Sequence, residues 1–276
     1  MRLSKRTNRV AVMAILNVTP DSFYESSRAL SSNLTECVER AIADGATIID
    51  VGGYSSRPGA AEVSLEEEWR RVDMGVRAVR DVSKSVVISV DTFRSEIVRR
   101  VYENYGSFVV NDITAGDVAN GGDSKMIRTV AELGLPYIAM HMRGTPATMQ
   151  QMTDYSADGG VVESVLSYFK AKIEECQAAG VKELILDPGF GFAKSLEQNY
   201  ELLSALDRLC DMGCEVLVGV SRKSMIYRLL GCEPKDALAG TNALNWEALS
   251  KGATILRVHD VRDASDVATI FEKYRV

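Results

Sequence analysis

The feature that most constrains the fold is a series of short apolar segments, rich in Val and Ile, that recur along the whole chain. Each segment carries a polar or charged residue at or near its end. The eight segments are residues 10–19, 46–53, 86–92, 108–114, 136–142, 183–189, 215–221 and 254–260. Near-continuous apolar strands are typical of a parallel sheet that is covered on both faces. The sequence therefore predicts eight buried, parallel β-strands.

Stretches with helical periodicity lie between these segments. Ser64 and Glu67 form a capping box ahead of a helix that we expect to end near Val82. Asn33 is expected to cap a helix that ends at Asp44. The remaining helices are expected at residues 95–105, 124–133, 163–179, 195–212, 234–251 and from about 264 to the C-terminus.

Eight strands that alternate with helices predict an α/β fold, a single-domain (β/α)8 TIM barrel over residues 1–276, with its active site at the C-terminal ends of the strands. No low-complexity segment, charge run or Pro/Ser-rich linker divides the chain. A doubly wound open sheet is the alternative. It would need a glycine-rich phosphate-binding fingerprint after the first strand, where the sequence is NVTPDSF.

Composition narrows the classes of function. With 46% hydrophobic and 25% charged residues, the chain is typical of a soluble globular protein, and a net charge of −6 disfavours binding to nucleic acid. The five cysteines are unevenly spaced and form no CxxC motif, so we expect free thiols in a reducing compartment. There is no long apolar run, so we expect a cytoplasmic protein with no signal peptide and no membrane span.

Polar side chains stand at the carboxyl end of every predicted strand, and these ends converge on one mouth of a barrel. One such group alone is explained by a helix cap or a turn. Eight strands of eight predict a shared pocket. The groups are Asn17, Asp50, Asp91, Asn111 with Asp112, His141, Asp187, Ser221 with Arg222 and Lys223, and Arg257 with His259.

One part of this set suits a flat heterocycle. Asp91, Asn111 and Asp187 offer carboxylate and amide groups that accept hydrogen bonds from ring N–H and amino groups. Lys223 adds a cation for a ring carbonyl or a ring nitrogen. His141 is different: between two methionines, it is interpreted as a buried, hydrogen-bonded histidine.

Another part suits an anion. Arg57, Arg257 and His259 form a cationic set that can bind phosphate or diphosphate. Asn17 can hold Mg²⁺ through its side-chain carbonyl oxygen while the phosphates of a ligand supply the negative charge. The whole pattern predicts a substrate with a flat ring and an anionic group.

In a series of motifs, the chain resembles the dihydropteroate synthase family. One of the motifs alone is weakly specific, but the ordered set covers nearly the whole chain. The motifs are MAILNVTPDSF, ADGATIIDVGGYSSRPGA, ISVDTF, VNDITAG, MHMRGTPATMQ, ILDPGFGFAKS, GVSRKSMI and GTNALNWEALSKGATILRVHD. The resemblance implies a folate-pathway transferase that joins 4-aminobenzoate to 6-hydroxymethyl-7,8-dihydropterin diphosphate by dissociative displacement. It also implies a homodimer, Mg²⁺ as cofactor and inhibition by sulfonamides.

The resemblance implies roles for individual residues as well. Those for the pterin ring are Asp91, Asn111, Met140, Asp187 and Lys223. Those for the diphosphate are Ser56, Arg257 and His259, with Mg²⁺ on Asn17. Those for 4-aminobenzoate are Arg57, Pro58, Phe192, Lys223 and Ser224. The expected catalytic residues are Arg57, Asp91, Asp187, Lys223, Arg257 and His259.

Two long loops, residues 18–30 and 54–63, are candidate lids, and each departs from the family pattern. The first usually continues with an acid and a glycine pair, whereas here Glu25 precedes two serines. The second often has Thr before Arg-Pro, whereas here it has Ser56, which retains the hydroxyl. Both changes bear on the geometry of the loops, which the resemblance does not define.

Two other functions share part of the pattern. A barrel that takes a methyl group from methyltetrahydrofolate would share the ring-binding groups, but it would not need residues 56–58, 221–224 and 257–259. A non-catalytic paralogue that binds pterin is the second alternative. The presence of Lys223 and Arg257 disfavours it.

Overall fold

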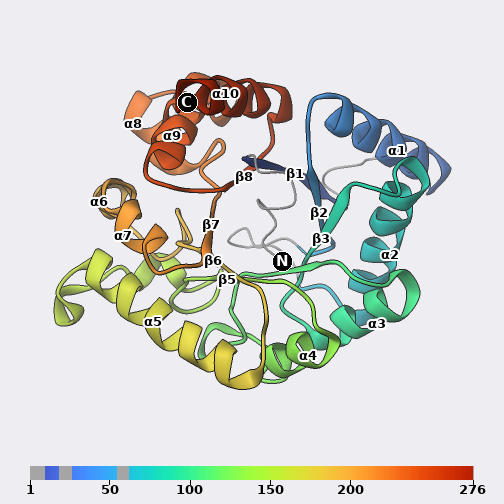
Figure 1. The fold of residues 1–276 in the computed structure, drawn as a ribbon, viewed down its shortest axis with the longest axis horizontal. Coiled ribbons are helices and arrows are strands. Elements are labelled where there is room, and N and C mark those ends of the chain that lie inside the picture. Colours follow the sequence, from blue (N-terminus) through green and yellow to red (C-terminus); the bar gives the residue numbers. More distant parts are fainter. Residues whose placement is uncertain (1–9, 19–26, 55–61, 276) are drawn as a thin grey trace.

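The computed structural model describes residues 10–18, 27–54 and 62–275, which form a barrel of parallel strands inside a ring of helices (Figure 1). The strands pair in chain order, and β8 pairs with β1 to close the barrel. They are β1 (Ala11–Asn17), β2 (Ile48–Gly52), β3 (Val87–Asp91), β4 (Val109–Asp112), β5 (Tyr137–Met140), β6 (Leu184–Asp187), β7 (Glu215–Val218) and β8 (Ile255–Val258). The predicted (β/α)8 barrel is confirmed, and the open sheet is excluded.

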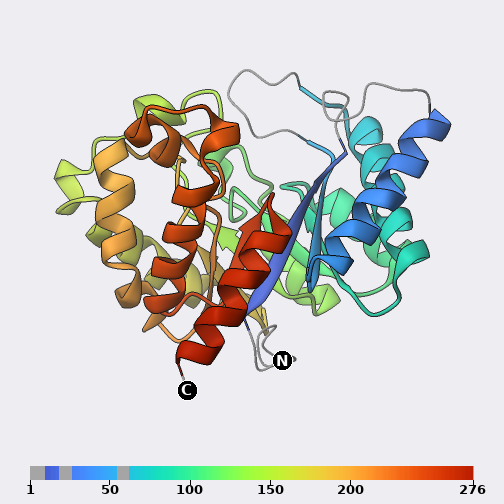
Figure 2. The same ribbon diagram turned by 90° about the horizontal axis from the view of Figure 1, so that it is seen from above.

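The helices connect the strands and cover the outside of the barrel. They are α1 (Ser27–Ala43), α2 (Leu65–Val82), α3 (Ser95–Tyr105), α4 (Met126–Leu133), α5 (Val161–Ala179), α6 (Leu196–Ser204), α7 (Leu206–Cys210), α8 (Ser224–Leu230), α9 (Leu238–Ser250) and α10 (Val261–Tyr274). Figure 2 shows α10 beside α9 and against β1, where the barrel closes. In the part of the chain that the structure describes, no helix is both long and apolar enough to cross a membrane.

An apolar layer fills the interior of the barrel near the start of the strands. Side chains from seven of the strands meet there in one cluster, and Val87 of β3 packs against it. The members are Ala11, Met13, Ile48, Val109, Ile138, Ile185, Leu217 and Ile255. Because side chains alternate along a strand, the residue two positions later faces the same interior space. This rule directs the polar residues near the strand ends into the barrel mouth, above the apolar layer.

The helix starts follow the sequence signals in part. Ser64 caps α2 by accepting a hydrogen bond from the Glu67 backbone N–H. The Glu67 carboxylate binds Arg70 and Arg71 instead of closing the predicted capping box. Ser195 opens α6 with a complete capping box.

Other helix limits differ from the prediction. Helix α1 begins at Ser27, so Asn33 lies inside the helix and does not cap it. The predicted helix over residues 195–212 is two helices, α6 and α7, which meet at Ala205. Helix α8 was not predicted, and α10 begins at Val261. Tertiary packing overrides local propensity at these positions, because capping residues such as Asn are also tolerated inside a helix.

Gly75 brings α2 close to the barrel wall. A Cβ atom at this position would lie 2.5 Å from Val51 Cγ1 and 2.9 Å from Val18 Cγ2. An alanine would gain about 1 kcal/mol in helix propensity. Overpacking costs about 1–3 kcal/mol, and buried valines have few rotamers with which to escape.

We therefore expect Gly75→Ala to lower the free energy of unfolding by about 1–2 kcal/mol. Urea denaturation followed by circular dichroism measures it. Arg77→Ala, at an exposed position of the same helix, is the control and is expected to change stability by less than about 0.5 kcal/mol. A midpoint for Gly75→Ala at or above that of the wild type would contradict the close packing.

Candidate active site

A network of buried and partly buried polar groups joins four strands at the barrel mouth. The Arg257 Nε atom donates to Asp50 Oδ2 at 2.7 Å, and its Nη2 atom donates to Asp91 Oδ2 at 2.9 Å. Asn111 Nδ2 donates to the same Asp50 oxygen at 3.0 Å. The network therefore connects β2, β3, β4 and β8, and Asp50 lies at its centre.

Burial dominates the electrostatics of this network. It raises the pKa of Asp91 to about 7, with Arg257 opposing the shift and the Asp50 charge adding to it. Burial alone would lower the pKa of Arg257, but the Asp50 and Asp91 carboxylates raise it above its usual value. Asp50 is fully buried, and its Oδ1 atom has no hydrogen-bond partner among the described residues. That oxygen is an acceptor without a protein donor.

Asp187 and Lys223 form a second polar group, on the side of the mouth built by β6 and β7. Asp187 Oδ1 accepts from the Gly189 backbone N–H at 2.8 Å. Burial raises the pKa of Asp187, and the Lys223 cation opposes the shift. Burial lowers the pKa of Lys223 to about 8, with Asp187 opposing. The Lys223 Nζ atom donates to Phe190 O and lies 4.8 Å from the centre of the Phe192 ring.

Two glycines of the turn after β6 have backbone angles that favour glycine, and a side chain at the first of them would collide with the backbone. Gly189 has φ 67°, and a Cβ there would lie 2.1 Å from His141 O. Gly191 has φ 81°, and a Cβ there would lie 3.3 Å from Lys223 Cδ. Glycine alone adopts such angles readily. The turn therefore leaves space beside Asp187 and Lys223.

The ends of β7 and β8 are tied together next to this second polar group. Ser221 Oγ lies 3.0 Å from His259 Nδ1 and accepts from the His259 backbone N–H at 3.2 Å. Next to them, Arg222 makes a bidentate ion pair with Asp260, with distances of 2.8 and 2.6 Å. Arg222 has φ 55°, an uncommon angle for a residue with a side chain. The ion pair helps to hold that conformation.

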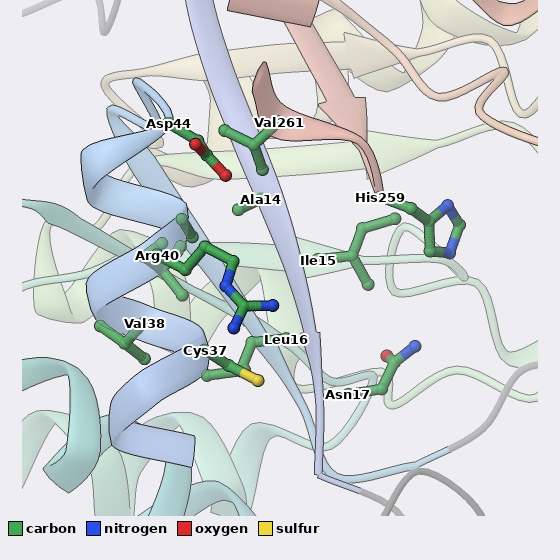
Figure 3. Close-up of a pocket in the computed structure, with 12 residues that line it drawn as sticks. Ala14, Ile15, Leu16, Asn17, Cys37, Val38, Arg40, Asp44, His259 and Val261 are labelled. Carbon is green, nitrogen blue, oxygen red and sulfur yellow. The ribbon is translucent and has the colours of Figure 1, made fainter. Parts of the chain in front are cut away.

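A cavity of about 320 Å³ lies between β1, α1 and the loop after β8 (Figure 3). It exists because β1 pairs with β8 only as far as Ala14, so the last part of β1 has no strand on that side. Asn17 and His259 line it from the barrel, and Cys37 and Arg40 line it from α1. The structure thus places Asn17 and His259, both predicted site residues, at one opening.

Some of the other predicted site residues are described by the structure, and some lie outside the described residues. Met140 is buried in a cluster with Met142, and Phe192 packs against that cluster. Ser224 is the first residue of α8, next to Lys223. The predictions for Ser56, Arg57, Pro58 and Glu25 lie outside the described residues.

Comparison with known proteins decides the family. The family model of pterin binding enzymes matches residues 13–259. Dihydropteroate synthase of Escherichia coli K12 is 44% identical over 266 residues, which cover 95% of this chain and 90% of that protein. The chain belongs to the dihydropteroate synthase family. It is therefore a transferase of folate biosynthesis, as its sequence predicts.

Solved structures of the dihydropteroate synthase family have the same fold. That of the Yersinia pestis enzyme with a sulfonamide drug complex has a TM-score of 0.87 and 37% identity, and covers 97% of this chain and 95% of that one. The Xanthomonas albilineans enzyme with 4-aminobenzoic acid has a TM-score of 0.85 and 36% identity, and covers 98% and 94%. Both cover the strands and helices described above.

Two functional features of this family member go beyond the residues singled out from its sequence. Asp50 is one of the residues predicted to share the pocket, but the sequence suggests no role for it, although it binds both Arg257 and Asn111. The predicted ring set and cationic set are also not separate, since Arg257 binds Asp91. The sequence does contain a signal for the pairing of Asp50 with Arg257. Each of these two residues stands two positions after a member of the apolar layer, Ile48 or Ile255, and they carry opposite charges.

We expect Arg257→Met to lower the free energy of unfolding by about 3–5 kcal/mol at pH 8, because it leaves the buried Asp50 and the partly buried Asp91 without this cation. Folding raises the pKa of Asp91 from 3.8 to about 7, so its ionisation already reduces stability as the pH rises through this range. Without Arg257 that pKa rises further. The loss should therefore be smaller at pH 5, and urea denaturation at both pH values measures it.

Asp91→Asn is the matched control. It removes one of two acids that share one arginine and should stay close to wild-type stability at pH 8. It should also flatten the decline in stability between pH 5 and pH 8. Equal losses for Arg257→Met at the two pH values would contradict the charge network as the source of its effect.

Proposed function

We propose that the protein condenses 6-hydroxymethyl-7,8-dihydropterin diphosphate with 4-aminobenzoate, giving 7,8-dihydropteroate and diphosphate. The observation that carries the proposal is a set of acids and one amide at the mouth of a barrel of this family: Asp50, Asn111 and Asp187, which are buried, and Asp91, which is partly buried. Such groups suit a ring that is rich in N–H donors. The matching Xanthomonas albilineans enzyme was solved with 4-aminobenzoic acid.

The pterin ring would bind between the two polar groups. Donors on the ring would bond the Asp91 and Asp187 carboxylates and stabilise their charged forms, which burial disfavours in the free protein. Asn111 would bond the ring directly, and Lys223 would bond its carbonyl or a ring nitrogen. Met140 would form an apolar wall.

The diphosphate would lie at the opening lined by Asn17 and His259. Arg257, Arg57 and Ser56 are proposed to contact it too. Binding there places the leaving group beside cationic side chains, so its negative charge is stabilised as it develops.

Mg²⁺ is proposed to bind together with the diphosphate. Among the described residues no cluster of three acids, histidines or cysteines could hold a metal ion. The single neutral oxygen of the Asn17 side chain fits an ion that keeps its waters and takes the remaining ligands from phosphate. When bound, Mg²⁺ would neutralise part of the charge on the leaving diphosphate.

The reaction is proposed to be dissociative. The C–O bond to diphosphate breaks first, and the resulting pterin methylene cation is stabilised by the Asp91 and Asp187 carboxylates. 4-Aminobenzoate, held near Phe192, Lys223 and Ser224 with Arg57 and Pro58, then attacks through its neutral amine. No nucleophilic side chain is required.

We also propose that the protein is a cytoplasmic homodimer and that sulfonamides inhibit it. Large exposed side chains on α8 and α10, Leu229, Leu230, Ile270 and Tyr274, support self-association. The sulfonamide complex of the Yersinia pestis relative supports competition at the 4-aminobenzoate site. Light scattering and competition kinetics would test these two points.

Asp187→Asn is expected to lower turnover by about a hundredfold or more while the fold persists, since it removes a charge and keeps the shape. The assay supplies Mg²⁺, pterin diphosphate and 4-aminobenzoate and follows both dihydropteroate and diphosphate. Asp211→Asn, at an exposed position after α7, is the control. Wild-type turnover by Asp187→Asn would refute its role. Absence of dihydropteroate with the wild type would favour a methyltetrahydrofolate-type barrel or a non-catalytic paralogue.

Removal of Mg²⁺ with EDTA should abolish turnover and weaken binding of the pterin diphosphate. It should leave the affinity for the pterin without diphosphate unchanged, because the ion is proposed to bind through phosphate. Calorimetry with each ligand, with and without EDTA, measures the difference. An equal effect on both ligands would contradict this arrangement.

A further inference from the structure

Lys194 is a buried lysine whose hydrogen-bond partners in the described structure include no acid. Its side chain is nearly inaccessible, with a relative exposure of 4%. The Nζ atom lies 3.0 Å from His141 Nδ1 and donates to Gly189 O and Phe192 O, both at 3.0 Å. Lysine is almost never fully buried unless it is paired. The position of this side chain therefore needs a reason beyond packing.

The two carbonyl groups belong to the turn between β6 and α6, residues 188–194, which has an unusual backbone. Gly189, Gly191 and Ala193 all have positive φ, with 49° at Ala193. Alanine adopts this conformation only when the surroundings impose it. The turn therefore depends on contacts that hold it from outside.

The same turn carries much of the proposed site. The Gly189 backbone N–H donates to Asp187, and Phe190 O accepts from Lys223. The Phe192 ring faces the Lys223 ammonium group. Any change in the turn would move three groups that are proposed to contact substrate.

His141 completes the arrangement. Burial first, and then the Lys194 and Arg143 cations, lower the pKa of His141 well below its usual value, so the ring is neutral. Two of the three ammonium protons of Lys194 go to the carbonyls, and the third is directed at Nδ1, which accepts it if His141 carries its proton on Nε2. Burial lowers the pKa of Lys194 to about 7, with the Asp187 carboxylate opposing the shift and the Lys223 and Arg143 cations adding to it. The form with three protons therefore predominates below about pH 7.

We propose that Lys194 and His141 are a positioning pair, which locks residues 188–194 in the conformation that presents Asp187, Lys223 and Phe192 to the substrates. The proposal rests on the proposed function for its kinetic part. Its structural part, the order of the turn, does not depend on any activity.

Three variants test the pair. Lys194→Met keeps the length of the side chain and removes all three hydrogen bonds. His141→Leu removes only the acceptor. His141→Asn keeps an acceptor, because the Asn side-chain oxygen occupies nearly the place of Nδ1. Tyr155→Phe is the matched control, since the Tyr155 hydroxyl donates one neutral hydrogen bond to Ala193 O on the same turn.

Lys194→Met and His141→Leu should lower kcat/KM by up to about a hundredfold, as expected for a small misplacement of catalytic groups. They should also speed hydrogen–deuterium exchange of the amides in residues 188–194, with other segments unchanged. His141→Asn should restore both to near the wild type, and Tyr155→Phe should have a smaller effect than Lys194→Met.

Wild-type exchange and kinetics in Lys194→Met would overturn the proposal, as would His141→Asn behaving like His141→Leu. If Lys194→Met does not fold, the two His141 variants decide. If the wild type makes no dihydropteroate, the proposed function fails, while exchange of residues 188–194 still tests the positioning pair.

Discussion

Closure of the barrel through the pairing of β8 with β1 is the constraint on which the site depends. Since all eight strands are parallel and the ring is complete, every strand end points to the same mouth. The apolar layer fills the interior at the other end, and the alternation of side chains places polar groups directly above it. Residues as distant in the chain as Asp50 and Arg257 therefore meet at 2.7 Å.

The mouth concentrates charge that burial disfavours. Asp91 and Asp187 have raised pKa values, and Lys223 has a lowered one, because none of them is well solvated. Arg257 offsets part of this cost, but no group among the described residues donates a hydrogen bond to Asp50 Oδ1. A donor-rich ligand can supply the missing hydrogen bonds. A site that is electrostatically unsatisfied when empty thus gains more from binding than a satisfied one would.

The strands and their polar ends could be predicted because both follow local rules: apolar runs for a sheet covered on two faces, and convergence of parallel ends. The hydrogen-bond partners of the side chains at the mouth could not be predicted, because they depend on distances between strands that are far apart in the sequence. Arg257 was assigned to an anion on its charge alone, whereas its guanidinium also binds two acids. The break at Ala205 was missed because no Gly or Pro marks it, and helix α8 was missed because its seven residues are too few to show a helical period.

The turn after β6 combines two opposed requirements. It must be almost free of side chains next to Asp187, because a Cβ at Gly189 would collide with His141 O. A glycine-rich turn is also the segment with the most conformational freedom to lose. Small residues therefore leave space for a ligand, but they do not fix the backbone conformation that keeps this space free. The buried Lys194 side chain donates hydrogen bonds to two carbonyl groups of the turn, and in our proposal these bonds provide that restraint.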